Sequence, residues 1–223
     1  MTNNIYSVLE IEPVVEEDLR KKTCMDENTH TYCGKYRDVK NWDMRKFGNK
    51  VPPRASVLVS FRSSNKKDLI FYFPLQTGNI KDRPFISDFG GRCEPLEHPA
   101  QTAFRELEEE SLGIFSQYLT TERIDACDVY IHENPKSLSL IVWLEIDEEP
   151  PNIHELNIEF SARKNDKTIN VSDCTNETHS IIAIPSRHIN AQIANDKVNL
   201  VYNKRLFWAR LASIMRSLRH RYV

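Results

Sequence analysis

The sequence has no apolar stretch that approaches the length of a membrane-spanning helix, and its opening residues lack the basic start and apolar run of a signal peptide. Its five cysteines are odd in number and widely spaced, which argues against a framework of disulfides. No internal repeat or low-complexity segment is evident. We therefore expect a protein of the cytosol or nucleus that is neither secreted nor bound to a membrane.

The composition is that of a soluble globular protein, with 40% hydrophobic and 28% charged residues among 223. This length favours one hydrophobic core with extensions over two domains. Residues 1–50 are polar and show no sustained period, and the break at Val51-Pro52-Pro53 follows them. We interpret residues 1–50 as an N-terminal extension and residues 51–223 as the main domain.

The net charge of −2 conceals a strong asymmetry along the chain. Residues 94–160 contain 16 Asp and Glu against 3 Lys and Arg, a formal −13. Residues 187–223 contain 8 Lys and Arg against one Asp, a formal +7. The acidic middle suits cations and the basic end suits phosphate, so the chain carries both charges that handling a polyphosphate requires.

Apolar alternation and turn residues predict several strands and two hairpins. Around Asn165-Asp166, the alternation of apolar residues on both sides predicts a further, inserted hairpin. The expected strands are residues 54–62 and 68–75, which form the first hairpin, residues 126–132 and 137–146, which form the second, and residues 180–184. A stripe of apolar residues predicts a C-terminal helix with arginines on its opposite face: Leu200, Phe207, Leu211, Ile214 and Leu218 against Arg205, Arg216 and Arg219.

The segment from Gly91 to Ile114 predicts a helix with an acidic side and a core side. At about 100° per residue, Glu110 lies about 40° from Glu106 in one direction and Glu109 about 60° in the other, so the three carboxylates share a face. Glu108 points away from them and is expected to be solvated. The residues on the neighbouring arc can pack on a sheet: Ala100, Ala103, Phe104 and Leu107.

Three clustered carboxylates repel one another, which destabilises a helix unless positive charge is supplied. Arg105 precedes Glu109 by four positions and can pair with it, but one guanidinium cannot neutralise three acids. A divalent cation is the natural partner, and ligands that are all oxygen favour Mg²⁺ or Mn²⁺. Taken alone, the acidic run is more typical of a solvated helix face than of a metal site.

The spacing of the surrounding residues resembles the Nudix box, which is G, five residues, E, seven residues, then R-E-hydrophobic-x-E-E-x-G-hydrophobic. Gly91, Glu97 and the run from Arg105 to Glu110 match it, whereas Ser111-Leu112-Gly113-Ile114 has one residue more before the glycine. We expect this glycine to end a slightly longer helix at its C′ position. The resemblance implies an α/β fold, a Nudix-like α/β/α sandwich with a mixed sheet.

The resemblance also implies a reaction and a set of roles. Nudix enzymes cleave pyrophosphate links with water and divalent cations, here Mg²⁺ or Mn²⁺, for which Glu106, Glu109 and Glu110 would be ligands. Arg105 would orient a carboxylate, or form only a surface pair. Glu97 would brace the loop or reach a metal-bound water, or only cap the helix. Gly90 and Gly91 would let backbone carbonyls approach the cation, Gly91 as a ligand, or would only make the turn.

The box does not specify the general base. Glu177 lies just before the strand at residues 180–184, where the family often has a further acidic residue, and we favour it for this role. Glu133, in the loop of the second hairpin, is the alternative.

The substrate that we favour is a small molecule linked to a nucleoside diphosphate. The basic C-terminal helix could instead follow an RNA backbone, which would suit a Nudix enzyme that removes the mRNA cap. A non-catalytic Nudix-like module that binds a nucleotide or RNA is a third interpretation, disfavoured because every carboxylate of the box is present. Candidates for stacking on a base are Tyr32, Tyr36, Trp42, Tyr130 and Trp143.

Overall fold

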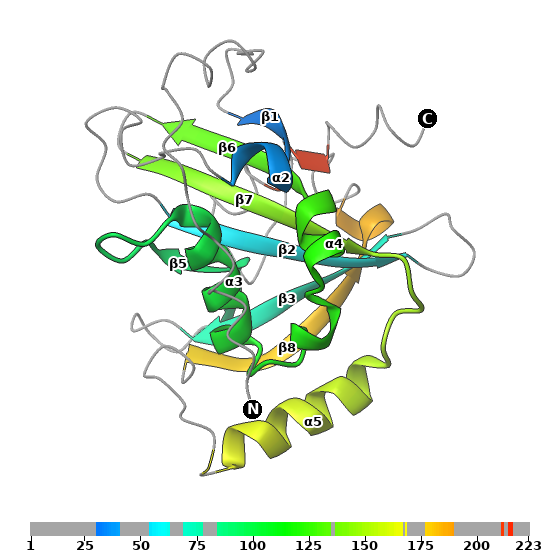
Figure 1. Cartoon of the computed structure of the whole chain (residues 1–223). Helices are drawn as coiled ribbons and strands as arrows, with labels where there is room; N and C mark the ends of the chain where they lie inside the picture. Colours follow the sequence, from blue (N-terminus) through cyan, green and yellow to red (C-terminus); the bar gives the residue numbers. More distant parts are fainter. Residues whose placement is uncertain are drawn as a thin grey trace.

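The computed structural model describes residues 30–40, 54–62, 69–77, 84–134, 137–166, 168, 177–189, 211 and 214–215. These residues form one eight-stranded sheet with helices on both faces (Figure 1). No helix among them is long and apolar enough to cross a membrane.

The sheet is mixed. Strand β2 (Arg54–Arg62) runs parallel to β7 (Ser137–Ile146), and the other strand pairs are antiparallel. The main path of the sheet is β1-β6-β7-β2-β3-β4, while β5 pairs with β2 and β8 pairs with β3. The remaining strands are β1 (His30–Lys35), β3 (Leu69–Thr77), β4 (Pro84–Ile86), β5 (Phe89–Arg92), β6 (Asp128–Asn134) and β8 (Thr178–Pro185).

On the edge of β2 that faces away from β7, two different strands pair with it, and residues of both contact the acidic helix. The first half of β2 pairs with β5, with Arg54 opposite Arg92 and Ser56 opposite Gly90. Its second half pairs with β3, with Val59 opposite Tyr72. The ends of β3 and β5 therefore meet along one edge of β2 without pairing with each other.

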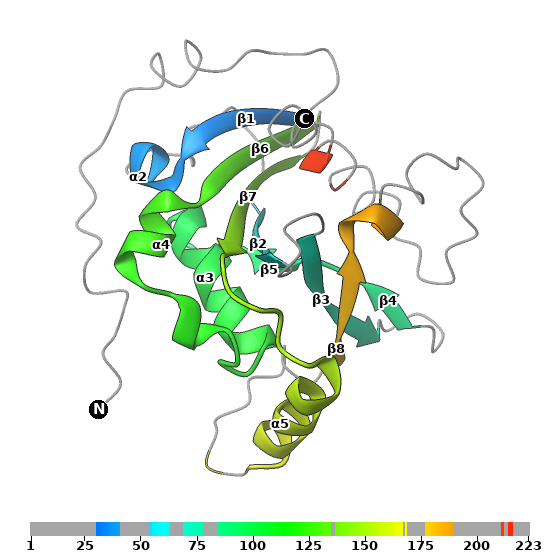
Figure 2. The same ribbon diagram turned by 90° about the vertical axis from the view of Figure 1, so that its right-hand side faces the viewer.

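Each face of the sheet has its own hydrophobic cluster because residues alternate along the strands. Val57 and Val59 of β2 belong to the cluster under α3 (Pro99–Glu110), whereas Leu58 belongs to the other cluster. That second cluster includes Leu211, Ile214 and Met215. In Figure 2, α3 and α4 (Thr121–Ala126) lie on one side of β6 and β7, and residues 211, 214 and 215 lie on the other.

The predicted sandwich and both predicted hairpins are confirmed, since β2 pairs with β3 and β6 pairs with β7. The predicted strand at residues 180–184 is also confirmed, as part of β8. At the C-terminus, Leu211, Ile214 and Met215 are helical and buried. The other residues of that predicted helix, with Arg205, Arg216 and Arg219, lie outside the described residues.

Part of the segment that we interpreted as an extension joins the sheet. Strand β1 pairs with β6, and α2 (Tyr36–Val39) follows it. Tyr36 and Val39 are buried, and the Tyr36 ring meets Phe104 of α3 edge to face, with ring centroids 5.5 Å apart. The rest of residues 1–50 lies outside the described residues.

The predicted inserted hairpin is wrong, because residues 153–165 form the helix α5 (Ile153–Asn165). The Asn152 side chain caps it by accepting hydrogen bonds from the backbone N–H groups of His154 and Glu155. Leu156 and Phe160 are buried four residues apart, whereas Ile158 between them is 58% exposed. The buried residues are spaced as in a helix, whereas the alternation of Leu156, Ile158 and Phe160 in the sequence also fitted a strand.

Candidate functional site

The acidic helix α3 begins at a strong cap. Nδ1 of His98 accepts a hydrogen bond from the Ala100 N–H at 3.1 Å, and the Gln101 side chain accepts one from the His98 N–H at 3.0 Å. These reciprocal bonds form a capping box, and Pro99 occupies the first turn, where its missing N–H costs no hydrogen bond. His98, not Glu97, therefore caps the helix.

The helix ends sooner than the sequence suggested, at Glu110. Leu112 adopts a left-handed backbone with φ 53°, and the next residue, Gly113, has φ 72°. The Gly113 N–H donates to the Glu108 carbonyl at 2.8 Å, and the Leu112 N–H donates to the Glu109 carbonyl at 3.1 Å, which is a Schellman ending. The extra residue relative to the Nudix box thus lies in the turn after the helix, and the acidic positions keep their spacing.

The predicted core side of α3 is confirmed, since all four residues on it are buried: Ala100, Ala103, Phe104 and Leu107. On the acidic side, Glu106 is 7% exposed and Glu110 is 5% exposed, and Glu109 is half-buried. Glu108 is half-buried and accepts a hydrogen bond from the Ser116 hydroxyl at 3.2 Å, so the prediction that it is solvated is wrong.

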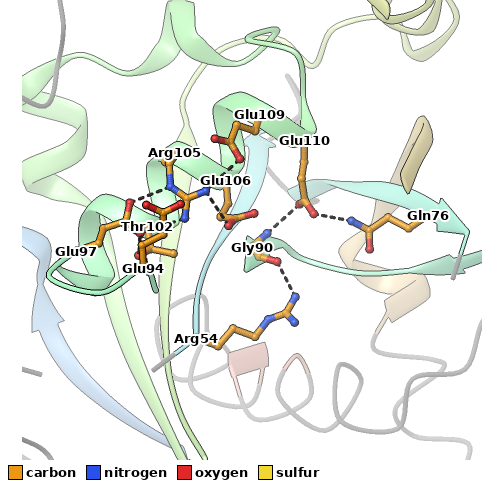
Figure 3. A network of polar contacts seen from close by, with 10 residues as sticks. All are labelled: Arg54, Gln76, Gly90, Glu94, Glu97, Thr102, Arg105, Glu106, Glu109 and Glu110. Atoms are coloured by element: carbon orange, nitrogen blue, oxygen red, sulfur yellow. Dashed lines mark hydrogen bonds and ion pairs between the residues drawn. The ribbon is translucent and has the colours of Figure 1, made fainter. Parts of the chain in front are cut away.

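Arg105 holds together three carboxylates that come from the loop and the helix (Figure 3). Its Nη1 lies 3.0 Å from Oε1 of Glu106 and 3.0 Å from Oε2 of Glu109. Its Nε and Nη2 donate to the two oxygens of Glu97 at 2.9 and 3.0 Å. Four charge-assisted hydrogen bonds from one guanidinium fix the relative positions of these side chains.

The Glu97 carboxylate accepts hydrogen bonds from several groups of the protein itself. Besides Arg105, it accepts hydrogen bonds from the Thr102 hydroxyl at 2.7 Å and the Glu94 N–H at 3.1 Å. Burial alone would raise the pKa of Glu97, but the hydrogen bonds from Arg105, Thr102 and Glu94 outweigh it and hold that pKa below its usual value. Of the roles that we considered, this geometry fits the brace between loop and helix.

Glu110 points to a different part of the sheet. Its Oε2 accepts a hydrogen bond from the Gly90 N–H at 2.9 Å, and its Oε1 accepts one from the Gln76 amide at 2.6 Å. Gly90 belongs to β5 and Gln76 to β3, so Glu110 connects the two strand ends that do not pair with each other. Burial raises the pKa of Glu110 to about 8. Burial likewise raises the pKa of Glu106, although Arg105 opposes the shift.

The two glycines are needed for close approach. A Cβ atom at Gly91 would overlap the Glu106 carboxylate, and one at Gly90 would overlap Ser56. The Gly90 carbonyl accepts a hydrogen bond from Nη2 of Arg54 at 2.6 Å. Both glycines lie in strand β5, so the expectation that they only make a turn is wrong. Their position in the strand brings the backbone against the acidic face of α3, as a carbonyl ligand at Gly91 would require.

Neither candidate for the general base has a described contact with α3. Glu177 is exposed and directly precedes Thr178, which is opposite Gln76 in the β3–β8 pair. Glu133 lies in β6 opposite Leu138, and its side chain is outside the described residues. The strand register places both at the end of the sheet where Arg54 begins β2.

The three described aromatic candidates for stacking are core residues, so that prediction is wrong for them. Tyr36, Tyr130 and Trp143 are each 1% exposed. The Trp143 indole donates a hydrogen bond to the Ser60 hydroxyl at 2.8 Å. The Tyr32 side chain and all of Trp42 lie outside the described residues.

Several polar residues at the site were missed by the sequence analysis. Gln76 binds Glu110, and Asp88, which is 2% exposed, accepts a hydrogen bond from the Ser56 hydroxyl at 2.7 Å. Arg54 binds the Gly90 carbonyl. Only Asp88 could have been noticed in the sequence, as an acidic residue within the apolar run Phe85–Phe89. Gln76 and Arg54 could be assigned to the site only once the pairing of the strands was known.

Solved structures similar to this chain include proteins named as Nudix hydrolases or as members of the mutT/nudix family. An Ap4A hydrolase from C. elegans, in a binary complex, is 13% identical over 75% of this chain and 99% of its own, with a TM-score of 0.37. A mutT/nudix family protein from Listeria innocua is 14% identical over 77% and 99%, with a TM-score of 0.40. A Nudix hydrolase from Alicyclobacillus acidocaldarius is 12% identical over 77% and 92%, with a TM-score of 0.42. The chain matches no family model and no curated protein.

The fold is Nudix-like. Helices cover both faces of a mixed sheet, and β5, its glycines and the acidic helix follow one another in the order that the Nudix box implies. The box residues Gly91, Glu97, Arg105 and Glu106 contact one another in this structure.

Proposed function

We propose that the chain is a Nudix hydrolase that depends on a divalent metal and cleaves the pyrophosphate linkage of a nucleoside diphosphate derivative. One observation carries the proposal. Two carboxylates of a single helix, Glu106 and Glu110, are buried beside the two glycines of β5, and burial raises the pKa of both. Because burial disfavours the charged form of both acids, a cation bound beside them would stabilise the ionised carboxylates that serve as ligands.

The charges around the site support a cation. Arg105 and Arg54 supply two positive charges to a group of five carboxyls: Glu97, Glu106, Glu109, Glu110 and Asp88. Full ionisation would leave three negative charges in excess, and burial makes such an excess costly. Oxygen ligands suit Mg²⁺ or Mn²⁺. Among the described residues, no three acidic, His or Cys side chains are gathered closely enough to bind one ion as they stand.

Binding of one cation by the carboxylates of α3 would require Glu110 to turn toward Glu106 and Glu109. Glu106 and Glu109 share Nη1 of Arg105, and Glu110 is held by two neutral donors, Gln76 and Gly90. We infer that, with a cation bound, Glu110 would give up one of these neutral donors, while Arg105 would keep the other two carboxylates in place. The expected ligands are therefore Glu106, Glu109 and Glu110, with the Gly91 carbonyl beside them.

The reaction requires that water attack a phosphorus surrounded by negative oxygens. The bound cation would neutralise those oxygens and lower the pKa of water. The chain would hold the ligands through Arg105, brace Arg105 through Glu97, and remove the proton of the attacking water through a carboxylate at the same end of the sheet. We propose Glu177 for that last role, since it adjoins the β8 residue opposite Gln76, with Glu133 as the alternative.

A nucleotide panel with Mg²⁺ or Mn²⁺ tests the proposal. It should contain nucleoside triphosphates, nucleotide sugars and dinucleoside polyphosphates, run beside capped RNA. The proposal predicts release of a nucleoside monophosphate that stops when the ion is chelated. Glu106→Gln should abolish this release, and Glu122→Gln, at an exposed glutamate of α4, should leave it unchanged.

The other outcomes contradict the proposal in distinct ways. Release of 7-methyl-GDP from capped RNA, without turnover of the small nucleotides, would make the chain a decapping enzyme. Binding without products would make it a non-catalytic module.

A further inference from the structure

Two arginines face each other at the edge of the site. Arg54 begins β2 and Arg92 ends β5, and the antiparallel register makes them direct partners. Side chains of such partners emerge from the same face of the sheet, which here is the face opposite α3, because Ala55 and Val57 of β2 face the helix. Like charges on such partners destabilise the pairing. A negative group bound between them would remove that repulsion.

Most of the hydrogen-bonding capacity of the Arg54 guanidinium is unused within the described part of the chain. Nη2 donates to the Gly90 carbonyl at 2.6 Å, and the buried Nε has no hydrogen-bond partner there. A guanidinium offers five N–H donors in a planar fork that matches phosphate oxygens. Arg105, by contrast, is used by three carboxylates.

The Gly90 peptide lies between this arginine and the acidic helix. Its N–H donates to Glu110 and its carbonyl accepts from Arg54 (Figure 3). Arg54 is close enough to act electrostatically on both Glu106 and Glu110. Within the described residues, neither Arg54 nor Arg92 forms an ion pair with a carboxylate. Positive charge thus borders the proposed cation site without a direct ion pair to its carboxylates among the described residues.

We propose that Arg54 and Arg92 bind phosphate oxygens of the substrate at the ends of β2 and β5, across the Gly90 peptide from the carboxylates of α3. The inference rests on the proposed function and deepens it, since it names the side chains that recognise the diphosphate. The cation would bind one part of the phosphate chain and the two arginines another. Because these contacts are to phosphate, they apply to any nucleoside carried by the diphosphate.

A purely structural role for Arg54, as a tie that holds Gly90, makes a different prediction. Loss of a structural tie would loosen β5 and weaken both cation and phosphate binding. Loss of a phosphate ligand would weaken phosphate binding only. Removal of a positive charge near Glu106 and Glu110 would leave cation affinity unchanged or make it tighter. The two roles therefore differ in the direction of the change in Mn²⁺ affinity.

The experiment uses methylene diphosphonate, a diphosphate mimic that cannot be hydrolysed and carries no base. Its affinity is measured by calorimetry with Mn²⁺ present, and Mn²⁺ affinity alone is measured separately. Arg54→Gln is expected to weaken diphosphonate binding by about tenfold or more, and Arg92→Gln in the same direction. Arg54→Lys keeps the charge but loses the fork, so a smaller loss is expected. Arg37→Gln, at an exposed arginine of α2, is the matched control and should bind as the wild type does.

The inference is overturned if diphosphonate affinity is unchanged in the folded Arg54 and Arg92 variants, or if Mn²⁺ affinity falls in parallel. Folding is checked by circular dichroism, and Arg54→Lys and Arg92→Gln decide the matter if Arg54→Gln does not fold. If the wild type releases nucleoside monophosphate while the arginine variants bind and turn over normally, only this inference fails. If the wild type neither takes up Mn²⁺ nor hydrolyses any nucleotide, the proposed function fails with it.

Discussion

The Glu106 carboxylate lies in the space that a side chain at Gly91 would fill. Glu106 is 7% exposed there and bound by Arg105, so it has little room to move away. The absence of a side chain at Gly91 is thus a condition for placing this carboxylate against the backbone of β5. Gly91→Ala should therefore displace Glu106 and weaken Mn²⁺ binding by at least about tenfold, measured by calorimetry. Mn²⁺ binding in the alanine variant that matches the wild type would contradict this relationship.

The planar guanidinium of Arg105 forms several hydrogen bonds at once in a geometry that a lysine ammonium cannot reproduce. Arg105→Lys keeps the charge but loses the simultaneous bonds to Glu97, Glu106 and Glu109. We expect kcat/KM to fall by about tenfold to a hundredfold, as is usual when groups that orient metal ligands are lost. Arg37→Lys is the control, because Arg37 is an exposed arginine of α2 that lies beside Asp38 and away from the acidic helix. Equal losses in the two variants would indicate a general effect of the substitution.

Glu97 should stabilise the fold in a way that depends on pH. Its pKa in the folded chain is held below the ordinary value of 4.5 because the hydrogen bonds from Arg105 and Thr102 outweigh burial. A lowered carboxyl pKa stabilises the fold above the ordinary pKa, and this contribution disappears as the pH falls through the folded value. Glu97→Gln should lower the free energy of unfolding by about 1–3 kcal/mol at neutral pH and by less in acid.

Urea unfolding of the wild type and Glu97→Gln at a series of pH values checks this sign. The gap between the two proteins should narrow as the pH is lowered below 4.5. Glu155→Gln, at an exposed position of α5, serves as the control and should show a much smaller gap. A gap that is constant or widens in acid would show that the Glu97 bonds do not favour the ionised carboxyl.

The division of roles between Glu110 and Glu177 is testable with paired substitutions. Glu110→Gln should abolish turnover and metal affinity together, because it removes a ligand. Glu177→Gln should slow turnover and leave metal affinity largely unchanged, because it removes only a base. Steady-state kinetics and Mn²⁺ titration of both variants separate the two roles. Equal loss of metal affinity in both variants would show that the division is wrong, and normal turnover in Glu177→Gln would favour Glu133 as the base.

The acidic helix could be predicted from the sequence because the residues that determine it are close to one another along the chain. Period, spacing and flanking residues place Ala103 and Leu107 in the core and Glu106 and Glu110 on one face, and the structure has them so. The end of the helix could not be predicted in the same way. Leu112 adopts a left-handed backbone that such a residue rarely takes, and only the hydrogen bonds of the folded turn show it.

The remaining parts of the site depend on which strands become neighbours. Gln76 and Gly90 bind Glu110 because β3 and β5 meet along one edge of β2, a fact of topology that no short motif contains. The error at α5 has a related cause. A few alternating apolar residues fit a strand or a helix equally well, and the choice is made by the Asn152 cap and by packing on the core.

Calorimetric titration of the wild-type chain with Mn²⁺ tests the central claim most directly, because every proposed role assumes that the carboxylates of α3 bind a divalent cation. The account predicts saturable uptake by the wild type, a loss of at least about tenfold in affinity in Glu106→Gln and Glu110→Gln, and unchanged affinity in Glu122→Gln. No uptake by the wild type, or the same uptake by all four proteins, would contradict it.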